Sequence, residues 1–398
     1  MTGEKGKQAR RQAQSKQAQS KQAAKRLGTY RAKRDPSKTP EPMGSEGVRS
    51  GRSAGSGGRT PRAPRFVIQE HHARALHWDF RLEHDGVYVS WALPKGLPLD
   101  PSTNHLAVHT EDHPLEYGEF QGEIPKGEYG GGQVTIWDHG TYDTEKWSER
   151  EVMVVLHGGR SNGRYVLFAT GGKNWMIHRM DPAPEGFEPM PDTIEPMLAK
   201  AVESMPEGDD WAYEFDWDGE RAILFVDGGR VRVAGSSEKD HLRSVPELRA
   251  IGEFLGSRPA VLDGLLVELE GARPSYLAFD LLYLDGRLLL TNSYDKRRAK
   301  LESLGLAGDA FATSPSFSGV AHTDVLAAAR QNGLKGIVAK RRNSPYTPGK
   351  VTGDWVALKK TEKGAVKKTE KGAVKAQSTP ERVNPDRDDR KSRRPAAR

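Results

Sequence analysis

The segment 76–83 constrains the fold of this chain most, because polar and apolar residues alternate along it without a break. One set of alternate positions is polar, with His77, Asp79, Arg81 and Glu83. The intervening positions are apolar, with Trp78, Phe80 and Leu82. Successive side chains of a β-strand point to opposite faces, so the pattern predicts a strand with one buried face and one face of ionisable groups. His84-Asp85-Gly86 then predicts a turn into the next strand.

Two residues on the polar face are spaced to bind one ion. His77 and Asp79 lie two positions apart, and His71 lies six positions before His77. A His-His-Asp set suits Mn²⁺, Zn²⁺ or Fe²⁺ and leaves coordination positions open for water or substrate. The spacing fits equally well a half-exposed strand whose polar face only meets solvent, so both interpretations stay open here.

A second group of ionisable residues lies in HLAVHTEDHPLEYGEFQGEIPKGEYGGG, residues 105–132. It contains His105, His109, His113 and Tyr117. His113 is a candidate general acid at neutral pH, and Tyr117 is a candidate donor to a phosphate oxygen. Each histidine taken alone is better explained by structural packing, so only the combination with the metal set points to a site.

Changes in composition and residue pattern divide the chain into two bodies. Short β-rich segments separated by Gly, Pro and Asp run from residue 66 to 181, which is typical of a barrel or a sandwich. Residues 182–195 are rich in Pro and Glu and are predicted to be a linker. Residues 196–360 mix strand and helix patterns, with helices expected at 296–305 and 322–333, so this body is predicted to be α+β.

The formal net charge of +7 is unevenly distributed. Residues 1–64 hold 16 basic and 4 acidic side chains, and residues 359–398 hold 14 basic and 6 acidic ones. The body between them, 65–358, therefore carries −13. Two basic arms on an acidic body indicate a partner rich in phosphate, such as nucleic acid, which such arms bind largely by counterion release. The alternative is a pair of solubilising tails without a dedicated partner.

Both ends of the chain are low in complexity. QAQSK occurs twice at 12–21, and KKTEKGAV occurs twice at 359–374. Disordered basic tails are therefore expected at 1–27 and 361–398, with a flexible linker at 44–64. The sequence has no cysteine, which excludes disulfides, thiolate metal sites and cysteine nucleophiles. No apolar run approaches a membrane span, so a cytoplasmic, nucleoid-associated protein without membrane contact is expected.

Two segments of the first body resemble the 3′-phosphoesterase domain of bacterial DNA ligase D. They are QEHHARALHWDFRLEHDGVYVSWALPKG (69–96) and HTEDHPLEYGEFQGEIPKGEYGGG (109–132). The similarity covers 28–181 and includes the arm YRAKRDPSKTPEP (30–42). It implies a compact β-barrel that uses Mn²⁺, or another divalent metal, to remove a 3′ phosphate or 3′ ribonucleoside from a primer strand.

The same resemblance implies roles for individual residues. The metal ligands would be His71, His77 and Asp79. Arg81 would clamp the phosphate, and His113 would be the general acid. The other implied site residues are Tyr117, His105, Arg34, Asp35, Glu41 and Gln69. His105 stands where the family usually has arginine, and a histidine is a weaker, pH-dependent ligand for an anion.

Five segments of the second body resemble, in order, the adenylation domain of ATP-dependent DNA ligases, a nucleotidyltransferase fold. They are PMLAK (196–200), YEFDWDGER (213–221), VLDGLLVELE (261–270), YLAFDLLYLDG (276–286) and GLKGIVAKRRNSPYTPGKVTGDWVALK (333–359). In that family the lysine of Lys-x-Asp-Gly attacks the α-phosphate of ATP. Asp216 stands at the position of that lysine, and a carboxylate cannot form the phosphoramidate.

Other substitutions fall on the same site. Positions that are Arg, Glu, Glu and Lys in the family are here Ser236, Leu265, Lys335 and Ala357. The residues that are kept, and that are expected to line a degenerate nucleotide site, are Arg221, Phe279, Lys340 and Lys359. We expect an adenylation-like domain without ligase activity and without an OB-fold module, and we leave ATP binding open.

The fold class is therefore predicted to be multi-domain: an N-terminal β-barrel phosphoesterase and a C-terminal α+β nucleotidyltransferase-like domain. The predicted function is Mn-dependent processing of DNA 3′ ends during double-strand-break repair by end joining. The alternatives are an ATP-dependent DNA ligase with an unusual nucleophile and a non-catalytic DNA-end-binding adaptor. The expected partners are DNA with 3′ ends, as primer-templates or break ends, and an end-joining ligase, polymerase or end-binding protein.

Overall fold

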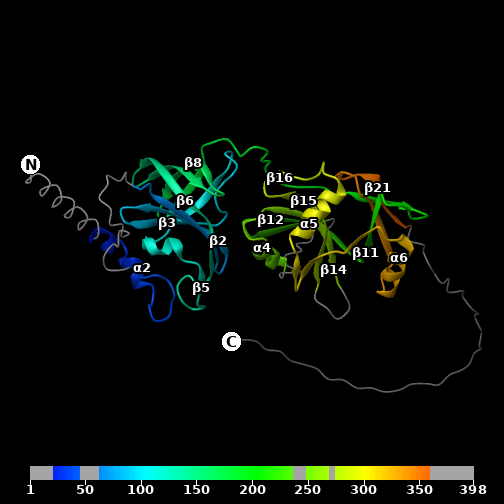
Figure 1. Ribbon diagram of the computed structural model, residues 1–398, viewed down its shortest axis with the longest axis horizontal. Helices are drawn as coiled ribbons and strands as arrows, with labels where there is room; N and C mark the ends of the chain where they lie inside the picture. The colour runs from blue at the N-terminus through cyan, green and yellow to red at the C-terminus, as the bar shows by residue number, and fades with distance from the viewer. Residues whose placement is uncertain (1–20, 45–61, 236–247, 269–273, 359–398) are drawn as a thin grey trace, which may run out of the picture. The chain divides into compact units, whose positions relative to one another are not determined.

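The computed structural model describes residues 21–44, 62–235, 248–268 and 274–358 (Figure 1). The predicted positions Ser236 and Lys359 lie outside the described residues, as do most of the predicted tails and of the 44–64 linker. Within the described part, no helix is both long enough and apolar enough to cross a membrane.

Eight strands between residues 65 and 179 close into a barrel (Figure 1). In order around the barrel they are β1 (Arg65–His72), β2 (Leu76–His84), β3 (Val87–Leu93), β4 (Asn104–His109), β9 (Asn174–Arg179), β8 (Asn162–Gly171), β7 (Glu151–Gly158) and β6 (Gly132–Trp147). Strand β6 pairs with β1 and closes the ring, and β5 (Gly122–Ile124) adds to the other edge of β6. The prediction of a barrel is confirmed, and the sandwich alternative is excluded by the closure.

Strand β2 follows the alternation of the sequence. Trp78, Phe80 and Leu82 are at most 2% exposed and pack in the barrel core. The turn after β2 has positive φ at both Asp85 (50°) and Gly86 (80°), the requirement of a two-residue type I′ hairpin. On the opposite face of β2, Asp79 and Arg81 are buried as well, and Arg81 lies against the ring of Tyr117 in the 3₁₀ helix η1 (Leu115–Glu119), whereas His77 and Glu83 are partly exposed.

The arm, residues 21–44, packs onto the barrel and contains α2 (Gly28–Ala32). Ala23 and Leu27 are buried against Val87, and Tyr30 is fully buried. These contacts correct the prediction of a disordered tail that continues to residue 27. Residues 21–27 are helical, since Ala23 and Leu27 lie one helical turn apart and form a small apolar stripe.

The second body consists of two sheets with helices. One sheet has the order β10 (Leu198–Val202), β21 (Val351–Leu358), β20 (Gly336–Arg341), β11 (Trp211–Asp216) and β19 (Ser316–Ser318). The other has the order β13 (Arg230–Gly235), β12 (Gly219–Asp227), β14 (Ala260–Val267), β15 (Ser275–Leu284), β18 (Phe311–Thr313) and β17 (Ala307–Gly308), with β16 (Arg287–Leu288) beside β15. The helices are α4 (Arg249–Leu255), α5 (Tyr294–Ser303) and α6 (His322–Gln331). The prediction of an α+β body is confirmed.

The predicted linker 182–195 is, in its second half, part of the second body. Met190 and Ile194 pack against the core that contains Phe279. The hydroxyl of Tyr283 donates to the Glu188 carbonyl at 2.8 Å, and the backbone of β16 donates to the Glu188 carboxylate. The apolar residues among the prolines explain why this half is docked.

Candidate functional site

His71, His77 and Asp79 converge at one end of the β1–β2 pair. His71 lies opposite His77 in the antiparallel register, and Asp79 lies two residues further along β2. One ligand atom from each residue lies within 4.8 Å of the others. The Asp79 carboxylate is 3.5 Å from Nδ1 of His71 and 3.7 Å from Nε2 of His77. This geometry favours the metal-site interpretation over a solvent-facing strand.

The second ring nitrogen of each histidine is fixed by a backbone carbonyl. Nε2 of His71 lies 2.8 Å from the Gly130 carbonyl, and Nδ1 of His77 lies 3.0 Å from the Ala75 carbonyl. A carbonyl only accepts, so these nitrogens carry protons, and the nitrogens that face Asp79 are the ones positioned to bind a cation. Such outer hydrogen bonds orient histidine ligands in metal sites. The three side chains therefore fit a divalent cation.

Arg81 is 1% exposed and connects the metal set to the rest of the site. Its Nη2 donates to Asp79 at 2.8 Å, its Nε to Gln69 at 2.7 Å and its Nη1 to Ser90 at 3.0 Å. Burial raises the pKa of Asp79, but Arg81 and the two histidines outweigh burial and hold the pKa well below its usual range. The carboxylate is therefore ionised and available as a ligand at neutral pH.

His113 lies beside this group and is 4% exposed. Its Nδ1 donates to the Glu111 carbonyl at 2.8 Å, which leaves Nε2 as the nitrogen that can exchange a proton. The Tyr30 and Tyr117 rings pack edge-on against it at 5.0 and 4.8 Å between ring centroids. Burial lowers the pKa of His113 well below its usual value, and Arg81 lowers it further. The imidazole is therefore neutral until an anion enters the site.

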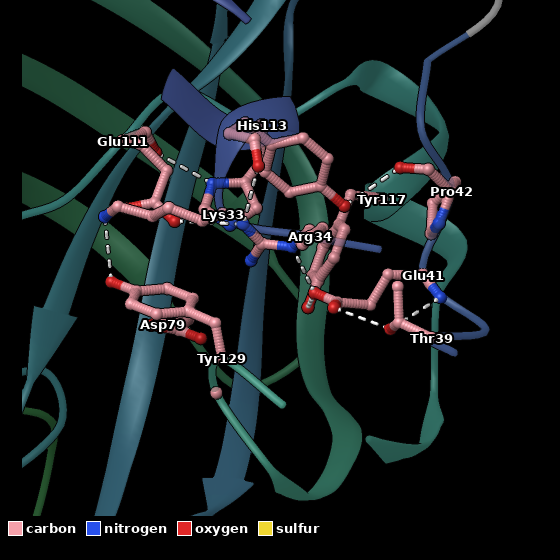
Figure 2. Close-up of polar contacts among 12 residues, drawn as sticks. Lys33, Arg34, Thr39, Glu41, Pro42, Asp79, Glu111, His113, Tyr117 and Tyr129 are labelled. Carbon is pink, nitrogen blue, oxygen red and sulfur yellow. Dashed lines mark hydrogen bonds and ion pairs between the residues drawn. The ribbon is translucent and has the colours of Figure 1, made fainter. Parts of the chain in front are cut away.

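The N-terminal arm supplies two further side chains of the site, Arg34 and Glu41. Arg34 donates to Glu41 at 2.9 Å and to Glu111 at 3.1 Å, and its guanidinium lies 3.7 Å from the Tyr30 ring centroid (Figure 2). Glu41 is 4% exposed and accepts a hydrogen bond from the Tyr117 hydroxyl at 3.0 Å. These contacts join the predicted site residues Arg34, Glu41 and Tyr117 in one network. The network also includes two residues that the sequence analysis did not identify, Glu111 and Tyr30.

Two predicted residues make their hydrogen bonds elsewhere. Asp35 accepts from the backbone and hydroxyl of Ser37 and forms a turn within the arm. Nδ1 of His105 lies 2.9 Å from the Gly96 carbonyl rather than on a residue of the metal set. Burial lowers the pKa of His105. An uncharged His105 is a poor ligand for an anion.

Sequence reasoning missed Glu111, Tyr30, Lys33 and Ser90. Glu111 receives Lys33 at 2.9 Å in addition to Arg34 (Figure 2). The position of Glu111 two residues before His113 is the one signal that could have identified it. Tyr30 continues the apolar stripe of Ala23 and Leu27 by a further helical turn, and that spacing is the signal that could have identified it.

The second body places the retained ligase-like residues around one aromatic ring. Arg221 forms an ion pair with Asp263, and its guanidinium lies 4.5 Å from the centroid of Phe279. Nζ of Lys340 lies 2.8 Å from the Glu214 carboxylate and 4.1 Å from the same ring centroid. Phe279 is 6% exposed, so side chains of the protein itself cover the ring that was predicted to line the nucleotide site.

Asp216 lies opposite Gly336 in the β11–β20 register. The neighbouring Lys335 forms an ion pair with Asp218. This hydrogen-bonded pairing raises the pKa of Lys335, and the charge of Asp216 contributes. The family resemblance implied lysine at position 216 and glutamate at position 335, so relative to that expectation the two charges are exchanged across one strand pair.

Two family models match the two bodies. Residues 69–169 match the DNA Ligase D 3′-phosphoesterase domain, and residues 266–359 match the ATP dependent DNA ligase domain. The first match includes the metal set and His113. The second includes Phe279 and Lys340.

Two curated relatives each match 84% of this chain. The chain is 45% identical over 356 residues to the multifunctional non-homologous end joining protein LigD of Mycobacterium bovis, over 84% of this chain and 45% of that protein. It is 33% identical over 408 residues to the LigD of Pseudomonas aeruginosa, over 84% of this chain and 47% of that protein. The chain thus spans about half the length of these relatives.

A solved structure of mycobacterial DNA ligase D complexed with ATP and MES is 34% identical, with a TM-score of 0.38, and the match covers 42% of this chain and 60% of that one. The two matched domains follow each other in this chain in the same order as the two sets of motifs. The chain therefore joins a domain of the DNA ligase D 3′-phosphoesterase family to a domain of the ATP-dependent DNA ligase family.

Proposed function

We propose that the barrel is a divalent-metal-dependent phosphoesterase that removes a 3′ phosphate or a 3′ ribonucleotide from DNA ends during end joining. The observation that carries this proposal is the convergence of His71, His77 and Asp79 beside Arg81 and His113. Mn²⁺ is the proposed metal, since two imidazoles and one carboxylate suit it. When bound, the metal supplies positive charge that stabilises the phosphorus oxygens in the transition state.

Arg81 is the proposed phosphate clamp. Among the described residues, three of its five N–H groups donate hydrogen bonds, one each to Gln69, Ser90 and Asp79. One N–H on each terminal nitrogen is therefore left for two oxygens of a phosphate, which matches the guanidinium fork. The three internal bonds hold the fork rigidly, so little reorganisation is needed during the reaction.

His113 is the proposed general acid for the leaving oxygen. The Glu111 carbonyl fixes the proton on Nδ1, so a transferable proton can sit only on Nε2. A phosphate anion beside the imidazole raises its pKa and favours protonation when substrate binds. For a 3′ phosphate, water would bond to the phosphorus as the bond to the 3′ oxygen of the DNA breaks, and the histidine would give its proton to that leaving oxygen.

We infer that the second body does not transfer AMP and serves as a scaffold for binding DNA or a protein partner. Asp216 offers no amine for the family's phosphoramidate, and Lys335 is ion-paired to Asp218. Nζ of Lys340 lies against Glu214, and Arg221 is bound to Asp263. End-joining repair is proposed because the relatives are named for it, with an end-joining ligase, polymerase or end-binding protein as partner.

A 5′-labelled primer-template that ends in a 3′ phosphate or one 3′ ribonucleotide tests this function. The full chain should trim the end with Mn²⁺ and not with EDTA. His77→Ala should abolish trimming, whereas His157→Ala, at an exposed histidine of β7 paired with Asp143, should leave it unchanged. Absence of trimming by wild-type protein that binds Mn²⁺ would refute the proposal and favour the DNA-end-binding adaptor.

A further inference from the structure

Tyr129 is an exposed aromatic residue whose position is nevertheless fixed. It is 48% exposed, in the glycine-rich loop before β6. Nζ of Lys33 donates to its hydroxyl at 3.0 Å and lies 4.3 Å from the ring centroid (Figure 2). The guanidinium of Arg34 lies 5.3 Å from the same centroid. Two cations of the arm therefore hold a ring whose remaining surface faces solvent.

The backbone ties this ring to the metal centre. The carbonyl of the next residue, Gly130, accepts the hydrogen bond from His71 that orients this candidate ligand. Gly130 has a φ of +78°, a conformation that glycine adopts without strain. Lys33 also pairs with Glu111 at 2.9 Å, and Glu111 supplies the carbonyl that orients His113. Tyr129 is thus linked through Gly130 to the candidate metal ligand His71. It is also linked, through Lys33 and Glu111, to the candidate general acid His113.

We propose that Tyr129 is the platform on which the nucleobase next to the 3′ phosphoryl group stacks, and that it selects nucleic-acid ends over other phosphomonoesters. This inference rests on the proposed phosphoesterase function. A phosphoryl group on the metal set places the attached sugar and base one nucleotide away, at the rim where Tyr129 lies. Aromatic rings stack on every base with little sequence preference, which suits an enzyme for arbitrary DNA ends.

Lys33, whose side chain is 30% exposed, fits the same substrate, whereas Arg34 is 4% exposed and stays bound to Glu41 and Glu111. Nucleic-acid sites for single strands combine basic side chains along the backbone with aromatic side chains under the bases. The bond from Lys33 to the Tyr129 hydroxyl restricts the ring before DNA binds, so less conformational entropy is lost on stacking. A simpler role is available, in which the tyrosine only anchors the arm through that hydroxyl.

Tyr129→Phe and Tyr129→Ala separate these roles. The phenylalanine variant keeps the ring and loses the bond to Lys33, whereas the alanine variant loses both. Each variant is compared with wild type on a primer-template with a 3′ phosphate on a normal nucleotide and on the same DNA with an abasic terminal nucleotide. p-Nitrophenyl phosphate serves as a third substrate, without a nucleotide.

Tyr129→Ala should lower kcat/KM on the normal end about 5- to 150-fold, the range expected for loss of one stacked base. It should change the rates on the abasic end and on p-nitrophenyl phosphate little. Tyr129→Phe, which keeps the ring, should lose much less than the alanine variant on the normal end and should match wild type on the other two substrates. Equal losses on the normal and abasic ends, or a phenylalanine variant as poor as the alanine variant, would overturn the stacking role in favour of the anchor.

Binding of the same two DNAs, measured by fluorescence anisotropy in Mn²⁺, separates this inference from the proposed function. Wild-type protein that releases no phosphate from any substrate would refute the phosphoesterase. Tyr129 is the stacking platform if wild type binds the normal end more tightly than the abasic end and the alanine variant does not. Equal affinities of wild type for the two ends would overturn the inference whatever the activity.

Discussion

The barrel and the ligase-like body each contain a buried aspartate that is paired with an arginine beside an aromatic ring. In the barrel, Arg81 binds Asp79 at 2.8 Å and lies 4.6 Å from the Tyr117 ring centroid. In the ligase-like body, Arg221 binds Asp263 and lies 4.5 Å from the Phe279 ring centroid. The resemblance between the two arrangements ends at the groups that would react.

In the barrel, the atoms that the protein does not use are those that the chemistry requires. Nδ1 of His71 and Nε2 of His77 face Asp79 because backbone carbonyls occupy the other nitrogens. In the ligase-like body the cations Lys340 and Lys335 are paired with carboxylates of the same domain. A retained protein framework therefore does not by itself indicate retained activity. Retained activity is indicated by ring nitrogens and amines that remain positioned to bind metal or substrate.

Among the variants that test this difference between the two bodies, His113→Ala should lower the reaction rate most. Loss of a general acid should lower the rate on a DNA 3′ phosphate about 10²- to 10⁴-fold. The same variant should lose much less on p-nitrophenyl phosphate, because nitrophenolate leaves without protonation. Steady-state rates on the two substrates check this. A similar loss on both would show that His113 holds the phosphate or the fold and does not donate the proton.

The local pattern of the sequence predicted the barrel strands and the metal set, because both depend on alternation and short spacing. His77, Asp79 and Arg81 lie on one strand face, and β1 brings His71 opposite His77 in register. The covering arm was less predictable. The burial of Glu41 and the role of Glu111 depend on contacts 70 or more residues apart in the chain, which no local pattern encodes.

The predicted location of His105 shows the same limit. Its position in the motif suggested a phosphate ligand, but the strand geometry gives its Nδ1 to the Gly96 carbonyl. In the ligase-like body the separate losses at positions 216 and 335 were visible in the sequence. Their relation as neighbours across β11 and β20 required the strand pairing.

A second prediction concerns the framework that the ligase-like body has kept. Arg297 and Asp280 are fully buried, and two nitrogens of Arg297 bind the carboxylate at 2.8 and 3.0 Å. Arg297→Met leaves the Asp280 charge buried and unpaired, which should lower the free energy of unfolding of this domain by about 3–5 kcal/mol.

Arg258→Met is the matched control, since the Arg258–Asp285 pair is 43% and 47% exposed. It should cost at most about 1 kcal/mol. Urea unfolding followed by tryptophan fluorescence measures both variants. Equal, small effects of the two variants would show that the body tolerates broken internal pairs and is an eroding relic, not a maintained scaffold.

AMP transfer is expected to change least. Its measurement tests directly whether the ligase-like body lacks the reactive groups of its family. Wild-type protein incubated with α-labelled ATP and Mg²⁺ should take up no acid-stable label. Asp216→Lys should take up none either, because the new ammonium lies across from Gly336 and beside the ammonium of Lys335. Leu265, at the position of a metal-site glutamate, is a further obstacle that this variant retains.

The double variant Asp216→Lys/Lys335→Glu restores the family's charges at both positions and removes the repulsion. Label in the double variant alone would make the charge exchange the decisive loss and the remaining pocket competent. Label in the single variant would contradict the view that the retained cations are committed to internal pairs, since Arg221 and Lys340 would then have to release Asp263 and Glu214 to ATP. No label in either would place the block in the pocket as a whole, which is the outcome expected from its self-paired cations.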